Sequence, residues 1–221
     1  MLLYKFMNAK WGLTAIRDRR IKFTRVLAAN DPFEFLGLAV SDRAGRAYLR
    51  KKRQELDEAC ALLCLAADWK HPLMWAHYAD NHQGICLCFD VSTDHYFWPV
   101  SYLPRRLELE DLGKASASEI DTADIVRLMY SKFDGWSYEQ EFRTHTPLEP
   151  ELLEKSTGHY FHQFGEKLRL RKVMVGYKSL VTRAQILDAL GSLGMDVESF
   201  KVRPAFKDFS LTRNLRNREW R

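Results

Sequence analysis

Two short, nearly continuous apolar runs constrain the fold of this chain most strongly. They are residues 59–65, which read ACALLCL, and residues 85–90, which read ICLCFD. Neither approaches the roughly 18 apolar residues that a membrane-spanning helix needs. Both predict strands, and the almost unbroken second run is typical of a strand that is buried on both faces at the centre of a sheet. We therefore expect a sheet with residues 85–90 in its interior.

Strand and helix patterns follow one another irregularly along the rest of the chain. Alternating side chains predict further strands, and amphipathic spacing with capping residues predicts helices. The predicted strands are 2–6, 20–24, 98–103, 136–143, 167–176, 197–202 and 206–211, and the predicted helices are 10–19, 41–58, 71–84, 118–133 and 182–193. This order predicts an α+β fold, with a bent, mostly antiparallel sheet flanked by helices.

The length of 221 residues suits one domain. We assign residues 1–212 to a single α+β domain, in which the basic, polar helix 41–58 is an insertion lying over the surface. Residues 213–221 form a basic C-terminal tail. The first residues, MLLYKFM, lack the long apolar segment of a signal peptide, so we expect a cytoplasmic protein with no membrane partner.

The four cysteines lie within the apolar runs, at Cys60, Cys64, Cys86 and Cys88. Their C-x3-C and C-x-C spacings differ from the paired C-x2-C spacing of zinc sites, so we predict no metal. Buried thiols in adjacent strands fit the apolar surroundings better. A cytoplasmic setting also argues against disulfides.

The net charge of +5 is concentrated at the C-terminal end. Residues 201–221 hold seven basic and two acidic residues, which account for the whole excess. Such a segment could contact RNA, DNA or an acidic partner. The alternative is a solvated, partly frayed chain end.

The most chemically suggestive segment is 136–143, WSYEQEFR. As a strand it would place Glu139, Glu141 and Arg143 on one face, because side chains alternate along a strand. In a cleft, two carboxylates beside a guanidinium suit acid–base chemistry or the recognition of a cation. On an exposed face they would form an ion-pair ladder of little energetic value.

Two further segments are rich in polar groups. In 74–84, MWAHYADNHQG, Tyr78 and His82 lie four residues apart and share one helix face. His77 and His82 are five apart, which does not suit a metal pair, and a structural hydrogen-bonding role is the alternative to a site. In 30–34, NDPFE, Asx-turn chemistry and Pro32 predict a rigid turn. That turn either caps the next helix or presents Asp31 or Glu34 to a ligand.

No motif of a well-known nucleotide-binding or hydrolase class is present. The sequence contains no G-x-S-x-G, G-x-G-x-x-G or G-x-x-x-x-G-K-[ST]. The absence of these motifs does not exclude nucleotide binding by a fold that lacks them.

Together the segments LYKF and NDPFE, MWAHYADNHQGIC, and WSYEQEFR resemble an uncharacterised bacterial and phage family, defined as a domain of unknown function. Their order and spacing match over residues 3–211. The resemblance implies no established activity. It implies a context among accessory genes of mobile elements, phage defence and toxin–antitoxin systems.

A more distant resemblance is to ADP-ribosyltransferases of the DNA-modifying toxin type. The opening strand, helix, strand and polar loop are similar, and Glu139-Gln-Glu141 resembles the late E-x-E of those enzymes. Tyr78 or Thr24 would serve as the middle-strand residue. Lys5 stands where those enzymes place a histidine on the first strand. The resemblance implies an ADP-ribosyltransferase-like fold with Glu141 as the principal carboxylate.

This resemblance implies NAD as substrate, with no other cofactor. Carboxylates would stabilise the oxocarbenium-like state formed when the nicotinamide–ribose bond breaks. The expected catalytic residues are Glu141, Glu139 and Tyr78, and the expected ligand-binding residues are Lys5, Asn30, Asp31, Trp75, His77, His82 and Arg143. Of these, Trp75 and Tyr78 would stack on nicotinamide, and Arg143 would hold Glu141 or the pyrophosphate.

Two functions follow from these interpretations. The first is an ADP-ribosyltransferase-like enzyme that transfers ADP-ribose or hydrolyses NAD in a toxin or phage-defence setting. The alternative is a non-catalytic module of a defence system that binds a nucleotide, a nucleic acid or a protein.

Overall fold

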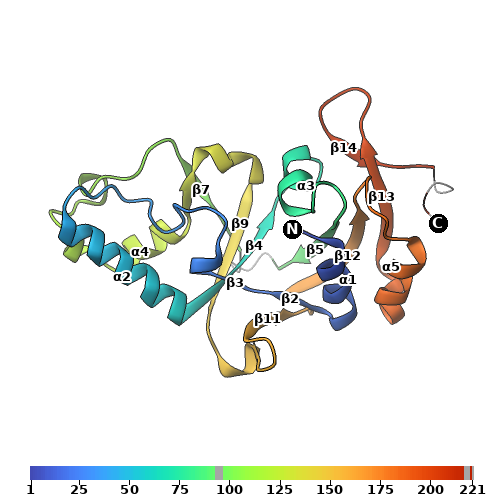
Figure 1. Ribbon diagram of the computed structural model, residues 1–221, viewed down its shortest axis with the longest axis horizontal. Helices are drawn as coiled ribbons and strands as arrows, with labels where there is room; N and C mark the ends of the chain where they lie inside the picture. Colours follow the sequence, from blue (N-terminus) through green and yellow to red (C-terminus); the bar gives the residue numbers. More distant parts are fainter. Residues whose placement is uncertain (93–96, 217–219, 221) are drawn as a thin grey trace.

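One large sheet organises the protein (Figure 1). The computed structural model describes residues 1–92, 97–216 and 220. The sheet has nine strands, in the order β14 (Leu211–Arg213), β13 (Glu198–Pro204), β12 (Leu168–Val175), β5 (Ile85–Val91), β1 (Leu2–Met7), β4 (Cys60–Ala66), β9 (Glu141–Pro147) and β6 (Trp98–Pro99), with β3 (Thr24–Arg25) also paired to β4. Its pairs are antiparallel except β12–β13. The predicted mostly antiparallel α+β fold is therefore confirmed.

The two apolar runs form strands, as predicted, and both lie in the interior of the sheet, as was predicted for residues 85–90. Strand β5 pairs with β1 on one side and β12 on the other, and β4 lies between β1 and β9. The cysteines are free thiols, and Cys60, Cys86 and Cys88 are buried. The prediction that they occupy adjacent strands is wrong, because β1 separates β4 from β5. Chain order could not reveal that the first strand inserts between two later ones.

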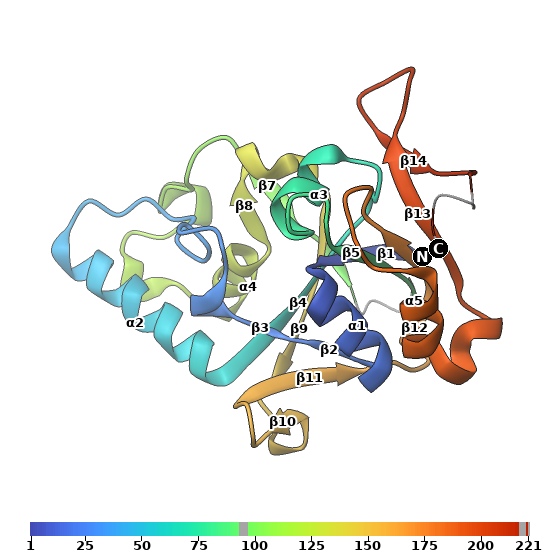
Figure 2. The ribbon, with the colours of Figure 1, turned by 45° about the vertical axis from the view of Figure 1, so that its right-hand side comes forward.

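Helices cover both faces of the sheet. Helices α1 (Ala9–Asp18) and α5 (Arg183–Leu190) pack in one apolar cluster with the inward side chains of β1 and β5. Helix α3 (Pro72–Tyr78) packs in a second cluster with the opposite face of the same strands. Figures 1 and 2 show α1 and α5 side by side, with α3 on the other side of β1. The sheet is thus a central layer between two helical layers.

Smaller elements complete the end of the molecule that lies opposite β13 and β14 (Figure 2). Helices α2 (Arg43–Ala59) and α4 (Thr122–Met129) lie there, beside the parallel pair β7 (Ser101–Leu103) and β8 (Ser131–Phe133). A third sheet joins β2 (Arg20–Lys22), β11 (His159–Gln163) and β10 (Leu153–Glu154). Short 3-10 turns are η1 (Val26–Ala28), η2 (Glu110–Leu112), η3 (Ala117–Glu119), η4 (Asp134–Glu139), η5 (Pro150–Leu152) and η6 (Gly191–Met195).

Several predicted boundaries are wrong for identifiable reasons. The helix predicted over 118–133 begins only after Asp121, whose carboxylate forms a capping box with Asp124, and it ends before β8. The predicted strand 98–103 divides at Val100 into β6 and β7, which join different sheets. The predicted strand 20–24 similarly divides at Phe23.

At the C-terminal end, the predicted strand 206–211 is mostly a loop, because β14 begins only at Leu211. Helix α5 has the predicted capping box of Thr182 and Gln185, but it ends at Leu190 rather than near Gly194. There, Gly191 leaves the helical conformation with a φ of 51°.

The basic tail predicted over 213–221 is described only in part, since Arg218 and Arg221 lie outside the described residues. Arg213 belongs to β14 and forms an ion pair with Glu198. Trp220 is buried, and its indole Nε1 donates to the Val181 carbonyl oxygen at 2.9 Å. The alternative of a solvated, partly frayed chain end is therefore wrong at Trp220, because its indole packs against the domain. Within the described residues, no helix combines the length and apolar character needed to cross a bilayer.

The turn after α3 is unusually tight. The predicted helix 71–84 ends at Tyr78, and Asp80, Asn81 and His82 all adopt the left-handed conformation, with φ of 48°, 50° and 71°. The backbone around Gly176 touches this turn, since a Cβ on Gly176 would lie 2.1 Å from the His82 carbonyl oxygen. Glycine is thus required for β12 to approach the turn.

We predict that Gly176→Ala destabilises the protein by about 2–4 kcal/mol, because the new methyl group must displace backbone rather than a mobile side chain. Urea unfolding followed by circular dichroism measures this change. The matched control is Gly165→Ala, where a Cβ meets nothing within 4 Å. Equal unfolding midpoints for the two variants would contradict the prediction.

Candidate functional site

A cavity of about 230 Å³ lies where β1, β4 and β9 meet α3 and the loop before Glu34. Apolar side chains, including Phe6, Leu65 and Met74, form part of its wall. Charged and polar side chains form the rest, and they are Tyr4, Lys5, Thr24, Asn30, Glu34, Tyr78, Lys132, Glu139, Glu141 and Arg143. The cavity therefore offers an apolar surface beside a dense polar network.

The segment 136–143 reaches this cavity, but not as one strand. Residues up to Glu139 form η4, Gln140 turns the chain with a φ of 43°, and β9 begins at Glu141. The predicted strand is therefore wrong over its first half. Its three charged side chains nevertheless converge, because Glu141 and Arg143 share one face of β9 and the turn directs Glu139 to the same place.

Arg143 is the most enclosed charge of the network. Its Nε donates to Glu141 Oε1 at 2.8 Å, and its Nη1 donates to Glu34 Oε1 at 2.6 Å and to the Met129 carbonyl oxygen. Its side chain is 1% exposed. The guanidinium thereby joins β9 to the NDPFE loop and to the end of α4.

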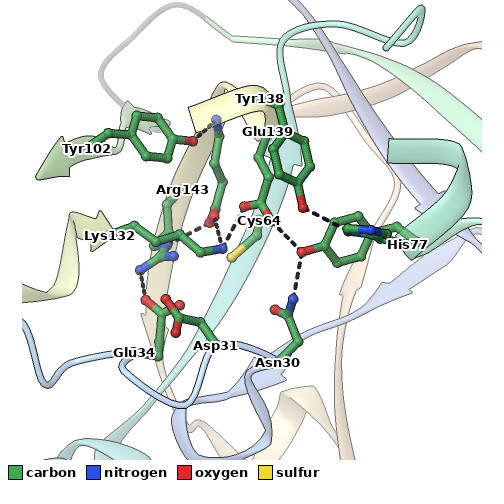
Figure 3. A network of polar contacts seen from close by, with 12 residues as sticks. Asn30, Asp31, Glu34, Cys64, His77, Tyr102, Lys132, Tyr138, Glu139 and Arg143 are labelled. Carbon is green, nitrogen blue, oxygen red and sulfur yellow. Dashed lines mark hydrogen bonds and ion pairs between the residues drawn. The ribbon is translucent and has the colours of Figure 1, made fainter. Parts of the chain in front are cut away.

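Lys132 is the second cation, and it links the two glutamates of the E-x-E segment. Its Nζ lies 2.6 Å from Glu139 Oε2 and 3.3 Å from Glu141 Oε2 (Figure 3). Three buried carboxylates, from Glu34, Glu139 and Glu141, thus share two buried cations. With every group ionised, the network carries one excess negative charge.

Tyr78 connects the network to the rim of the cavity. Its hydroxyl donates to Glu139 Oε1 and accepts a hydrogen bond of 2.7 Å from Asn30 Nδ2. Burial and the adjacent Glu139 carboxylate raise the pKa of Tyr78, so its hydroxyl keeps its proton. Tyr78 lies at the end of α3 and Asn30 in the exposed loop, so this chain of hydrogen bonds leads from the buried carboxylate toward solvent.

The two glutamates of the E-x-E segment have opposite pKa shifts. Burial acts to raise the pKa of Glu141, but Arg143 and Lys132 outweigh it and lower that pKa to about 2. Glu139 contacts only one of these cations, and burial raises its pKa above the usual value. Burial also raises the pKa of Glu34, against the opposing effect of Arg143. Glu141 is therefore ionised at neutral pH, whereas burial shifts the pKa of Glu139 toward the protonated form.

Lys5 lies in the cavity wall, on β1. Its Nζ donates to the Cys64 carbonyl oxygen on β4 at 3.0 Å. Burial raises the pKa of the neighbouring Cys64 thiol to about 12, so this thiol is not a nucleophile at neutral pH.

Asp31 lies beside Glu34 (Figure 3) but does not line the cavity. Its side chain accepts a hydrogen bond of 2.9 Å from the Phe33 amide and is 1% exposed. The second carboxylate oxygen, Oδ2, has no hydrogen-bond partner among the described residues. Asp31 thus shapes the NDPFE loop from within.

Three predicted ligand-binding residues lie away from the cavity. Trp75 is 0% exposed, and its indole donates to the Trp69 carbonyl oxygen, so stacking on a ligand is excluded by burial. His77 points outward, where its Nδ1 lies 2.8 Å from the Tyr138 hydroxyl. His82 packs on Tyr177 beyond the left-handed turn. The helical spacing that suggested one shared face fails because α3 ends at Tyr78.

Lys132 and Tyr102 were missed by the sequence analysis. Lys132 fell inside a predicted helix, where a lysine is common and indicates no functional site. In the structure it lies on β8 and is buried. Tyr102 accepts a hydrogen bond of 2.8 Å from the Glu141 amide. No local signal distinguishes either residue. Lys132 meets Glu139 and Glu141 only because the chain turns back between β8 and β9, and Tyr102 contacts a residue 39 positions later in the sequence. Among the described residues, no three His, Cys, Asp or Glu side chains are arranged to hold a metal ion.

Comparisons with protein-family models, with curated proteins and with solved structures find no match to this chain. The resemblance to a bacterial and phage family therefore stays a prediction.

Removing the Arg143 guanidinium should destabilise the protein strongly. We expect Arg143→Met to cost about 3–5 kcal/mol, because Glu34 and Glu141 would stay buried without their cation. Chemical unfolding measures the loss. The control is Arg171→Met, which breaks an exposed ion pair of 3.0 Å with Asp90 and should cost less than about 1 kcal/mol. A loss as small as that of the control would contradict the buried role.

Glu141 should make stability depend on acid pH. Its folded pKa of about 2 lies below the usual 4.5, so the ionised form favours folding above pH 4.5, and this contribution is lost as pH falls toward 2. Unfolding measured between pH 6 and pH 2 should show this loss in the wild type. In Glu141→Gln the loss should be smaller, and an unchanged slope would argue against the depressed pKa.

Proposed function

We propose that this protein cleaves the nicotinamide–ribose bond of NAD, with Glu139 and Tyr78 as the residues that act on the reacting groups. The observation that carries the proposal is the Glu139 carboxylate, which lines a cavity and contacts Tyr78 and Lys132 while burial raises its pKa. A general base works best when its pKa lies near the operating pH, and burial moves a carboxylate in that direction.

The two glutamates take different roles in the proposed reaction. As the C1′–N bond breaks, nicotinamide leaves with the bonding electron pair and positive charge develops on the ribose. Water or an acceptor hydroxyl then forms the new bond to C1′, and its proton passes to Glu139. Glu141 stays ionised, and through Lys132 it holds Glu139 in position. Glu139 thus replaces Glu141 as the principal carboxylate.

The character of the cavity supports a partly apolar ligand with a flat ring. Apolar residues such as Phe6 and Met74 suit the flat face of a nicotinamide ring, and Tyr78 adds an aromatic surface at the same wall. A volume of about 230 Å³ suits the nicotinamide and ribose rather than the whole dinucleotide.

An ADP-ribosyltransferase-like fold is part of the proposal. The opening order of β1, α1 and β2, and an E-x-E segment that reaches the same cavity as β1, support it. Lys5, at the place of the first-strand histidine, lines that cavity and is anchored to the Cys64 carbonyl oxygen. The proposed setting is the toxin or phage-defence role that the family resemblance suggests.

A non-catalytic binding module is the second candidate. It is favoured by the internal pairing of Glu34, Glu141 and Arg143, which would hold the cavity rigid without any chemistry. A protein that binds NAD without turning it over would have this second function.

Incubation of the purified protein with NAD, with nicotinamide release followed by chromatography, tests the proposal. Glu139→Gln should lower the rate by about 100-fold or more, because it removes the general base. Tyr78→Phe should lower it less, since the carboxylate remains. The acidic limb of the pH profile should disappear in Glu139→Gln.

The matched control is Glu151→Gln, which changes an exposed glutamate in η5 and should leave the rate unchanged. Circular dichroism should show that every variant is folded. The proposal fails if the wild type does not cleave NAD, or if Glu139→Gln cleaves it at the wild-type rate.

A further inference from the structure

A second pocket of about 270 Å³ lies directly behind Lys132. Phe33 and Phe133 line it, together with Leu103, Arg105 and Arg106. The two phenyl side chains are 50% and 52% exposed. Large apolar side chains are rarely left this open in a concave place unless they contact a ligand or partner.

The same two segments build this pocket and the cavity. In the NDPFE loop, Glu34 lines the cavity and its neighbour Phe33 lines the second pocket. On β8, Lys132 lines both and its neighbour Phe133 lines the second pocket. The buried Lys132 side chain thus lies between the cavity and the second pocket, and the NDPFE loop and β8 contribute side chains to both.

Phe33 is held in a fixed place by its backbone. Its amide donates to Asp31 Oδ1 at 2.9 Å, and its carbonyl oxygen accepts from the Leu36 amide at 2.8 Å. The next residues are anchored as well, because Glu34 pairs with Arg143 and Phe35 is buried in the left-handed conformation with a φ of 62°. A phenylalanine adopts this conformation only when its surroundings impose it.

Phe133 is fixed from the other side. Strand β8 pairs in parallel with β7, which places Phe133 beside Leu103. Its ring also lies against the backbone of Gly135, since a Cβ there would be 2.6 Å from a ring carbon. Both rings are therefore organised before any ligand arrives, which lowers the entropic cost of binding.

Positive charge accompanies the rings. The Arg106 guanidinium lies 4.9 Å from the centre of the Phe33 ring. Arg105 is held by Asp111 through two hydrogen bonds of 2.8 and 3.1 Å. The pocket thus combines flat aromatic surfaces with a guanidinium that is suited to an anionic group.

We propose that this pocket stacks a nucleobase and that Arg106 contacts the attached phosphate. The inference rests on the proposed function in taking the base to be the adenine of the dinucleotide whose nicotinamide half enters the cavity. Lys132 would then mark the boundary between the two halves of one site.

Isothermal titration with ADP, which lacks nicotinamide, tests this pocket alone. ADP should bind the wild type, and Phe33→Leu and Phe133→Leu should each weaken binding by about tenfold, the range expected when one base loses a stacking partner. Arg106→Gln should weaken ADP binding but leave adenosine binding unchanged.

The matched control is Phe206→Leu. Phe206 is 92% exposed and also lies under an arginine, with Arg203 at 4.7 Å, but it is outside this pocket. Absence of ADP binding, or equal binding by the Phe33, Phe133 and Phe206 variants, would overturn the inference. ADP binding without NAD cleavage would contradict only the proposed NAD cleavage. NAD cleavage without ADP binding would contradict only the assignment of this pocket to a nucleobase.

Discussion

The buried Arg143 guanidinium is the interaction on which the rest of the site depends. It joins three parts of the chain that are distant in sequence: β9 through Glu141, the NDPFE loop through Glu34, and the end of α4 through the Met129 carbonyl oxygen. A guanidinium can satisfy several acceptors in one plane, which a lysine cannot. Because burying such a charge is costly without full pairing, the three parts are held in one arrangement.

This arrangement gives two neighbouring glutamates different chemical characters. Glu141 forms ion pairs with both Arg143 and Lys132 and stays ionised. Glu139 forms an ion pair with Lys132 alone and lines the cavity. Pairs of titratable groups whose surroundings separate their pKa values are typical of acid–base sites. The turn at Gln140 produces this difference, because on one regular strand both carboxylates would have met similar surroundings.

The sequence predicted the parts of the fold that depend on local pattern. Strands β4 and β5 and the capping box of α5 follow from runs and spacings within a few residues. It did not predict the division of 136–143, because the left-handed Gln140 is imposed by the packing of η4 and β9. The role of Lys132 was not predicted for the same reason. It pairs with Glu139 and Glu141, and no sequence pattern around β8 indicates these contacts.

The position of β1 has a consequence for how the chain acquires its structure. This strand precedes both of its neighbours, β5 and β4, yet it lies between them, with Tyr4 opposite Cys88 on one side and Ala66 on the other. During synthesis, some 80 further residues must be added before both edges of β1 can be paired. At the usual rate of roughly 5–20 residues per second, this addition takes seconds. The edge that faces β5 stays unpaired throughout that interval, and the edge that faces β4 stays unpaired until β4 has been made, so both are open for a time to binding by chaperones or by other chains.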